Sequence, residues 1–268
     1  MGTASKDSGY QSNKGVHMKV DRVEDIDSGK IAELIANLGL DAVKRQLPEI
    51  KQAGQLIFAA VAGGGRVFTF GAGHAQALAM EFSSRAGGLA IFQSMHLQDI
   101  RQEPRDAFWD LRDSQPERIP ENGPKVLDHH KVTANDVVII ASQSGRNGAI
   151  VEMALECKRR GIKTIALSSN KHSESVDSRH PSGLMLSQVV DLSLDNGSVI
   201  GDAVAELPDG KSICSASTVC FVLIAQAINA EVTKLFLLNS LPAPLLVSAN
   251  LDHGDKANSP LKFPAITV

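Results

Sequence analysis

The sequence predicts an α/β protein in which helices cover both faces of a parallel β-sheet. Short apolar segments alternate along the chain with segments whose apolar residues recur every three or four positions, as in strands alternating with amphipathic helices. The strand segments are nearly continuous apolar runs, as expected for strands buried on both faces. With 268 residues, 43% apolar and 21% charged, the chain is large enough to bury a full core.

Two amphipathic helices are expected ahead of the sheet, within residues 18–65. Residues 28–62 carry apolar side chains at helical spacing, Ser28 is the expected N-cap, and glycines at 63–65 end the second helix. Residues 1–17 are rich in Gly, Ser, Lys and Asn and stop before a His-Met junction. We interpret them as an expression leader outside the fold.

The α/β unit is expected to span residues 66–258, with a tail at 259–268. Segments with the composition of strands are 66–70, 89–92, 136–141, 162–167 and 189–194. Segments with helical spacing are about 75–85, 147–160 and 215–238, whereas 196–209 has the Gly- and Asp-rich composition of a loop.

Residues 93–133 are expected to form an insertion in this unit. Their periodicity fails, because charged residues and four prolines interrupt the pattern. A stretch of this length without regular structure is uncommon inside a compact domain and is usually functional. We expect one or two short helices here, covering the site.

Composition and charge argue against several classes of function. The net charge is −3 without a basic run and aromatic residues make up 4%, so nucleic acid is not an expected partner. No run reaches the ~18 apolar residues that a membrane span requires. The three cysteines form no Cys-x-x-Cys pair and are expected to be buried, reduced thiols in the cytoplasm. The spacing of His96, His129 and His130 fits no metal-binding pattern, so no metal is expected.

The most informative segment is 137–147. Five apolar residues lead directly into Ser-Gln-Ser-Gly-Arg-Asn, and helical spacing then resumes. A strand, turn and helix in this order gather hydroxyls and free backbone N–H groups around one point, which suits a phosphate. Ser144, Arg146 or Asn147 could serve only as a helix cap, but two serines exceed what a cap requires and Arg146 adds a charge for an anion. The phosphate-binding candidates in this segment are Ser142, Gln143, Ser144, Gly145, Arg146 and Asn147.

Two further strand ends carry groups suited to a ligand, because parallel sheets bind ligands at the carboxyl ends of their strands. Gly73 follows the first strand, where glycine lets the backbone approach a ligand, and the adjacent His74 either contacts substrate or caps the next helix. Ser168 and Ser169 end the fourth strand and add two hydroxyls. The glycine turn at 71–73 lacks the third glycine of a dinucleotide fingerprint, so NAD binding is not expected.

Three residues are candidates for proton transfer. Glu81 lies in an otherwise apolar helical segment, where burial would raise the pKa of its carboxyl group and suit it to act as a general base. The alternative for Glu81 is an ion pair with Arg85 at i+4. His172 and His180 lie in polar segments after later strands, and the near-neutral pKa of free histidine suits both to move protons. Each taken alone is more often an incidental loop histidine.

At these motifs the sequence resembles the sugar isomerase (SIS) domain proteins, which are phosphosugar-binding α/β domains. Residues 142–145 are similar to the family's phosphate loop, 168–169 fall at its next strand exit, and 71–73 fall at its first glycine turn. The similarity covers residues 28–258. Motifs that resemble a bacterial subfamily are Gly71-x-Gly73-His74, Ser144-Gly145-Arg146-Asn147, and those at 178–183, 201–203 and 248–252.

The resemblance implies a flavodoxin-like three-layer sandwich with a five-stranded parallel sheet, and a homodimer or homotetramer with sites near subunit contacts. The family contains aldose–ketose isomerases, a lyase that cleaves the lactyl ether of N-acetylmuramic acid 6-phosphate, and sugar-phosphate-sensing domains. Two features depart from it. Many members place a serine after the glycine turn, where this chain has His74-Ala75, and the helix at 215–238 lacks the histidine that phosphoheptose isomerases use there.

We therefore expect a cytoplasmic protein that binds a phosphorylated sugar and isomerises it between aldose and ketose by proton transfer at C1 and C2. The alternatives are a non-catalytic sugar-phosphate sensor and an ether lyase acting on an amino-sugar phosphate. No cofactor is expected, because a carbonyl-stabilised carbanion needs only a base and a hydrogen-bond donor. Neither nucleic acid nor a membrane is an expected partner.

Overall fold

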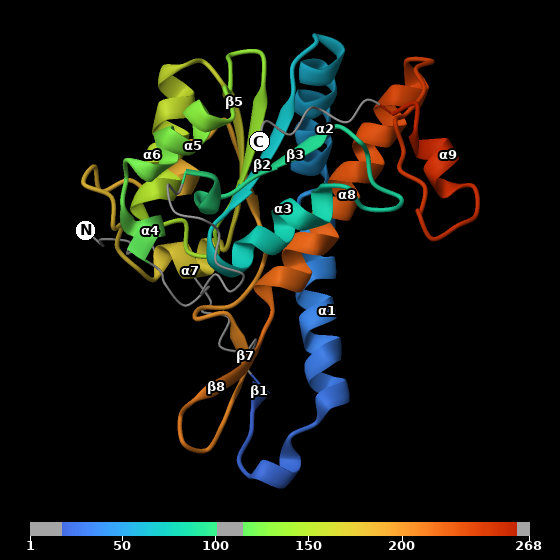
Figure 1. Cartoon of the computed structure of the whole chain (residues 1–268). Coiled ribbons are helices and arrows are strands. Elements are labelled where there is room, and N and C mark those ends of the chain that lie inside the picture. The colour runs from blue at the N-terminus through green and yellow to red at the C-terminus, as the bar shows by residue number, and fades with distance from the viewer. Residues whose placement is uncertain (1–17, 101–114, 262–268) are drawn as a thin grey trace, which may run out of the picture.

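The computed structural model describes residues 18–100 and 115–261, and its centre is a five-stranded parallel sheet with the strand order β3-β2-β4-β5-β6 (Figure 1). This order is the flavodoxin-like arrangement, in which the first strand of the sheet lies between the second and the third. It confirms the predicted fold class. The strands are β2 (Val67–Gly71), β3 (Phe92–Met95), β4 (Val137–Ala141), β5 (Lys163–Ser168) and β6 (Leu192–Asp195).

Helices cover both faces of this sheet and make the three layers visible in Figure 1. Successive residues of a strand point to opposite faces, so Ile139 of β4 packs with the helices of one layer and Ile140 with those of the other. Every residue of β4 is buried, which explains its continuous apolar run. One layer holds α1 (Ser28–Arg45), α2 (Leu47–Ala62), α3 (Gln76–Phe82) and α8 (Ser217–Leu238), and the other holds α5 (Asn122–His129) and α6 (Gly148–Arg159).

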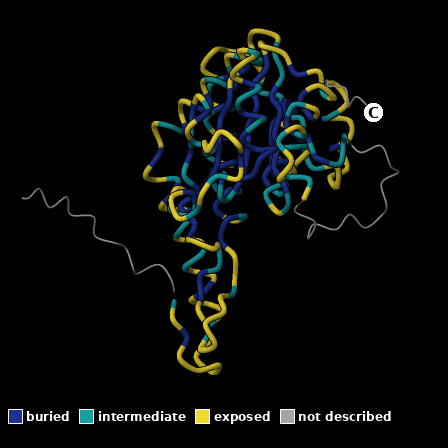
Figure 2. The backbone as a smooth tube through the Cα atoms, turned by 90° about the vertical axis from the view of Figure 1, so that its left-hand side faces the viewer, coloured by how far each residue is buried: buried dark blue, intermediate teal, exposed yellow. Residues whose placement is uncertain are grey.

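A second, three-stranded sheet has the order β1-β7-β8, where β1 is Met18–Lys19, β7 is Ala203–Glu206 and β8 is Ser212–Ser215. It projects from the main body with the start of α1, and much of its surface is exposed (Figures 1 and 2). The interpretation of residues 196–209 as a loop is therefore wrong at β7. Strand β7 pairs with β1, which is far away in sequence, so no local periodicity reveals it.

Three local expectations also need correction. The second strand begins at Phe92 and not at Leu89, because the backbone of residues 88–90 pairs with residues 244–246 near the C-terminus. The fifth strand is shorter than expected and spans Leu192–Asp195. Asp27, not Ser28, caps α1, since its carboxylate accepts a hydrogen bond from the Lys30 backbone N–H at 3.0 Å.

Residues 101–114 of the expected insertion lie outside the described residues; its described parts, 93–100 and 115–133, contain short helices, and residues 118–123 pack closely on α6. A Cβ on Gly123 of α5 would lie 2.4 Å from the Ala149 carbonyl oxygen, and one on Gly148 would lie 2.4 Å from the Arg118 carbonyl oxygen. These close approaches hold the segment against the first turn of α6. Its short elements are η3 (Leu97–Ile100) and α4 (Gln115–Arg118), and those elsewhere are η1 (Val23–Asp25), η2 (Gly73–Ala75), α7 (Asn170–Glu174), η4 (Leu186–Gln188) and α9 (Gly254–Asn258).

Helix α8 is the one helix in the described part of the chain that is long and apolar enough to cross a membrane by length and composition. Phe221 and Ile228 of α8 are buried against the sheet and the neighbouring helices. A helix in the core of a protein meets the same criteria of length and composition. The cysteines are free thiols, and Cys157 and Cys220 are buried as expected. Cys214 of β8 is exposed, which corrects that expectation.

Candidate functional site

The carboxyl ends of β2 and β4 lie side by side at the point where the strand order reverses. Neighbouring loops diverge to opposite faces at such a switch point and leave a crevice that α/β proteins use for ligands. The glycine turn at 71–73 follows β2, and the segment 142–147 follows β4. Both sequence-predicted loops therefore meet at one edge, near α4 and α7 in Figure 1.

The turn after β4 is built by its own residues. The Gly145 backbone N–H donates a hydrogen bond to the buried Ser142 hydroxyl at 3.1 Å, and Gly145 has a φ of +62° that favours glycine. Asn147 occupies the N-cap position of α6 without a side-chain capping bond; its amide oxygen instead accepts a hydrogen bond from Arg179 Nη1 at 3.0 Å. Ser142 thus stabilises the turn, and Asn147 holds the Arg179 guanidinium beside it.

Other candidates tie the neighbouring strand exits together. The Gln143 amide oxygen accepts a hydrogen bond from Asn196 Nδ2 at 2.6 Å, which joins the β4 exit to the β6 exit. The Ser169 hydroxyl donates to the Ser198 carbonyl at 2.7 Å and accepts from the His172 backbone N–H at 3.2 Å. These side chains have protein partners, so their role is to fix the strand exits relative to one another around the site.

Several polar atoms at the same edge have no protein partner in the described part of the chain. The Ser168 hydroxyl oxygen, His172 Nδ1 and Arg146 Nε are buried without a hydrogen bond. The half-buried Ser144 offers its hydroxyl as well, since only its backbone carbonyl is engaged, by Ser173. Buried polar groups normally find partners, so unpartnered ones on three adjacent elements indicate a place for a ligand.

The surroundings of His172 favour its neutral form. Burial lowers the pKa of its imidazole and the positive charge of Arg146 lowers it further, against an opposing effect of Asp202. Its backbone N–H donates to the Ser169 hydroxyl, which fixes the backbone of His172 at the start of α7. A neutral imidazole with an unpartnered Nδ1 can accept a proton or donate one, depending on its tautomer.

Three arginines gather at this edge without a carboxylate in ion-pair contact: Arg118 of α4, Arg146 of the loop after β4, and Arg179. Every other arginine of the described ranges has such a partner. Burial lowers the pKa of Arg179, and the like charges of Arg146 and Arg118 lower it further. A cluster of unpaired guanidinium groups is unfavourable by itself and is suited to an anion.

The sequence analysis missed Glu117 of α4. Its Oε2 lies 4.0 Å from the position that a Cβ on Gly73 would occupy, and Gly73 has a φ of +57°. Burial raises the pKa of the half-buried Glu117 carboxyl group, although Arg118 and Arg179 oppose this change. No sequence signal marks Glu117, since it lies in the aperiodic insertion and reaches the glycine turn only through the fold.

Glu81 lies on the other side of the glycine turn, on α3. Its Oε1 accepts a hydrogen bond from Gln226 Nε2 of α8 at 2.5 Å and forms an ion pair with Arg85 Nε at 3.0 Å. The i+4 pair considered in the sequence analysis is therefore present, and the carboxylate faces α8. His74 is exposed beside Gly73.

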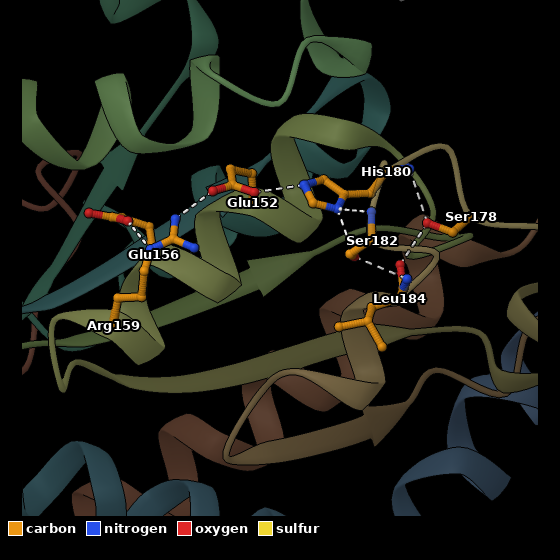
Figure 3. A network of polar contacts seen from close by, with 7 residues as sticks. All are labelled: Glu152, Glu156, Arg159, Ser178, His180, Ser182 and Leu184. Carbon is orange, nitrogen blue, oxygen red and sulfur yellow. Dashed lines mark hydrogen bonds and ion pairs between the residues drawn. The ribbon is translucent and has the colours of Figure 1, made fainter.

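His180 lies in a network that anchors its loop to α6 (Figure 3). Its Nε2 lies 2.7 Å from Glu152 Oε2 and its Nδ1 lies 2.8 Å from the Ser182 hydroxyl. The Ser182 backbone N–H also donates to Nδ1, so Nδ1 is an acceptor and Nε2–H donates to Glu152. Both ring nitrogens are engaged, and the loop they fix carries Arg179 to Asn147.

The pocket of about 420 Å³ beside this network is lined by Pro120, Glu121, Pro124, Glu152, His180 and Pro181. Its lining residues do not include Ser168, His172 or Arg146, which carry the unpartnered atoms. No cluster of three or more His, Cys, Asp or Glu side chains suited to a metal occurs among residues 18–100 and 115–261. His130, one of the histidines weighed in the sequence analysis, has its Nε2 2.9 Å from Asp99 Oδ2.

Fold and site together define a flavodoxin-like α/β protein with a cationic, hydroxyl-lined site at its switch point. The family profile described as SIS domain matches residues 32–169. The chain is 37% identical over 212 residues to a UPF0309 protein of Halalkalibacterium halodurans, covering 78% of this chain and 85% of the relative. It is 34% identical over 217 residues to a UPF0309 protein of Geobacillus thermodenitrificans, covering 81% and 86%. The chain belongs to the SIS domain family and, within it, to the UPF0309 proteins.

A solved structure from Bacteroides fragilis, described as that of a candidate phosphosugar isomerase involved in capsule formation, superimposes with a TM-score of 0.51. It is 21% identical, and the match covers 78% of this chain and 91% of that one. At this identity the similarity establishes the shared fold.

Proposed function

We propose that this protein binds a phosphorylated sugar at the carboxyl ends of β2 and β4 and isomerises it between aldose and ketose. The observation that carries the proposal is the group of Arg118, Arg146 and Arg179. Among residues 18–100 and 115–261 these arginines have no carboxylate in ion-pair contact, and buried hydroxyl and imidazole atoms beside them also lack partners. A phosphomonoester carries about two negative charges and several acceptor oxygens. It therefore pairs with the arginines and also accepts hydrogen bonds from the unpartnered polar groups.

The phosphate is bound by the loop after β4. The N-terminus of the 12-residue helix α6 presents free backbone N–H groups and the positive end of the helix dipole. The hydroxyls of Ser144 and Ser168 and the guanidinium of Arg146 complete the anion contacts. Ser142, Gln143 and Ser169 contribute indirectly, by fixing the loop.

Fixing the phosphate places the carbon chain of the sugar near the glycine turn, and the reaction requires a base for the C2 proton. Glu81 serves as this base in the proposal, with Gln226 and Arg85 setting its direction. His172, neutral and next to Arg146, moves hydroxyl protons or assists ring opening. His180 acts by position, because it holds the loop that carries Arg179.

The test is to incubate the protein with hexose, amino-hexose and heptose phosphates and to follow each by NMR. Formation of a ketose phosphate supports isomerisation. Release of lactate from an amino-sugar phosphate ether supports the lyase, and binding without chemistry supports a sensor. Ser144→Ala combined with Ser168→Ala should weaken binding of every sugar phosphate, whereas Ser212→Ala on the small sheet serves as the matched control. Unchanged affinity of the double variant would remove the phosphate site from the proposal.

We propose further that the protein acts in the cytoplasm as a homodimer or homotetramer. Free thiols and the exposed apolar residues Val219, Leu237 and Leu238 of α8 support this assignment. Sedimentation velocity at several protein concentrations tests the oligomeric state; a monomer at every concentration would contradict it.

A further inference from the structure

Glu117 of α4 lies close to both the glycine turn and the arginine cluster, and the proposed chemistry does not yet use it. Its Oε2 lies 4.0 Å from the position that a Cβ on Gly73 would occupy, so the carboxylate lies close to the glycine turn. No ion pair or hydrogen bond holds the carboxylate in the described part of the chain. A half-buried acid without a partner, facing the edge where a ligand is expected, is free to act on that ligand.

We propose that Glu117 is a second catalytic residue, which transfers protons to and from the oxygen atoms of the sugar; this inference rests on the proposed isomerase function. Neutral Glu117 donates its proton to the carbonyl oxygen O1 while Glu81 removes the proton from C2. The product is an enediol with hydroxyls at C1 and C2. Ionised Glu117 then takes the proton from O2 as the C2 carbonyl forms, and Glu81 returns its proton to C1. Both carboxyl groups end in their starting states, and the aldose has become a ketose.

The surroundings of Glu117 favour the neutral form of its carboxyl group. Burial raises its pKa, and the charges that act on it are those of Arg118 on its own helix and Arg179 on the loop anchored to α6. A bound phosphate offsets these two positive charges, so the pKa of Glu117 should rise further when substrate binds. Phosphate binding therefore favours the protonated form of Glu117, which is the form that donates a proton to O1.

The experiment compares Glu117→Gln with Glu121→Gln, a matched change four residues away at an exposed position. We expect Glu117→Gln to lower kcat for isomerisation about 100-fold or more with little change in KM, as for loss of a general acid–base group. Glu117→Asp should restore part of the rate. Glu121→Gln should match the wild type. Because glutamine removes a carboxylate whose ionised form burial disfavours, Glu117→Gln should melt at or above the wild-type temperature, which excludes misfolding as the cause.

A second readout does not depend on turnover. Calorimetric titration with inorganic phosphate, in buffers of different ionisation enthalpy, should show proton uptake by the wild type that is absent in Glu117→Gln. A wild-type protein that isomerises no sugar phosphate would overturn the proposed function and the reaction assigned to Glu117 with it. A wild-type enzyme that is active while Glu117→Gln turns over at the same rate, or takes up the same protons, would overturn the inference about Glu117 alone.

Discussion

Replacing Arg146 with glutamine should weaken the binding of sugar phosphates while raising the melting temperature of the free protein. In the free protein Arg146 has no carboxylate partner, and its charge opposes that of Arg179. Removing it relieves this repulsion. In the complex, the same change removes at least one charge-assisted hydrogen bond, worth about 1.5–3 kcal/mol. That free energy corresponds to about a 10- to 150-fold loss of affinity.

Calorimetric titration with a sugar phosphate and differential scanning calorimetry without ligand measure these opposite effects. Lys158→Gln is the matched control, since it removes the same charge from the other end of α6. Ten residues of helix separate Lys158 from Gly148, about 15 Å, which exceeds the Debye length of about 8 Å at physiological ionic strength. Equal loss of affinity in both variants would show that only net charge matters and would refute the assignment of Arg146.

Three further predictions concern the frame of the site. Asp202→Asn should destabilise the protein by about 2 kcal/mol in denaturant unfolding, since the carboxylate accepts hydrogen bonds from two backbone N–H groups at the start of α8. Gly145→Ala should cost about 1–2 kcal/mol and weaken phosphate binding, because φ is +62° there. Burial raises the pKa of Asp136, but hydrogen bonds from Arg66 and Thr133 hold it below its ordinary 3.8, so its stabilisation should fade as pH falls through the lowered value. Acid unfolding followed by circular dichroism should therefore be steeper for the wild type than for Asp136→Asn.

The main sheet could be predicted from the sequence because buried parallel strands leave a local signal. Residues 137–141 are apolar at every position, and the structure buries every one. The signal fails where pairing is distant. Leu89 is buried and apolar like a strand residue, but its backbone pairs with Leu245, and β7 pairs with Met18–Lys19. Local composition indicates whether a strand is buried, whereas the strand with which it pairs depends on residues that are far away in the sequence.

The loop after β4 could be predicted for a similar reason, since its groups are consecutive in the sequence. Glu117 and Arg118 could not, because the insertion brings them to the site only through close packing of its Gly123 on α6 and of Arg118 on Gly148 of α6. The sequence also does not tell which polar groups are satisfied. The Gln143 side chain bonds to the β6 exit, whereas the Ser168 hydroxyl has no partner in the described ranges, and only the fold distinguishes them.

This distinction leads to a prediction for His180, whose two ring nitrogens both have protein partners. If His180 acts by fixing its loop, Glu152→Ala should reproduce the effect of His180→Gln: weaker sugar-phosphate binding through a displaced Arg179, with the pH profile of kcat unchanged. The double variant should be little worse than either single variant, because both remove the same anchor. If His180 instead moves protons during the reaction, His180→Gln should change the pH profile of kcat and Glu152→Ala should spare most of the binding. Steady-state kinetics across pH for the three variants separates the two roles, and a changed profile confined to His180→Gln would refute the anchor.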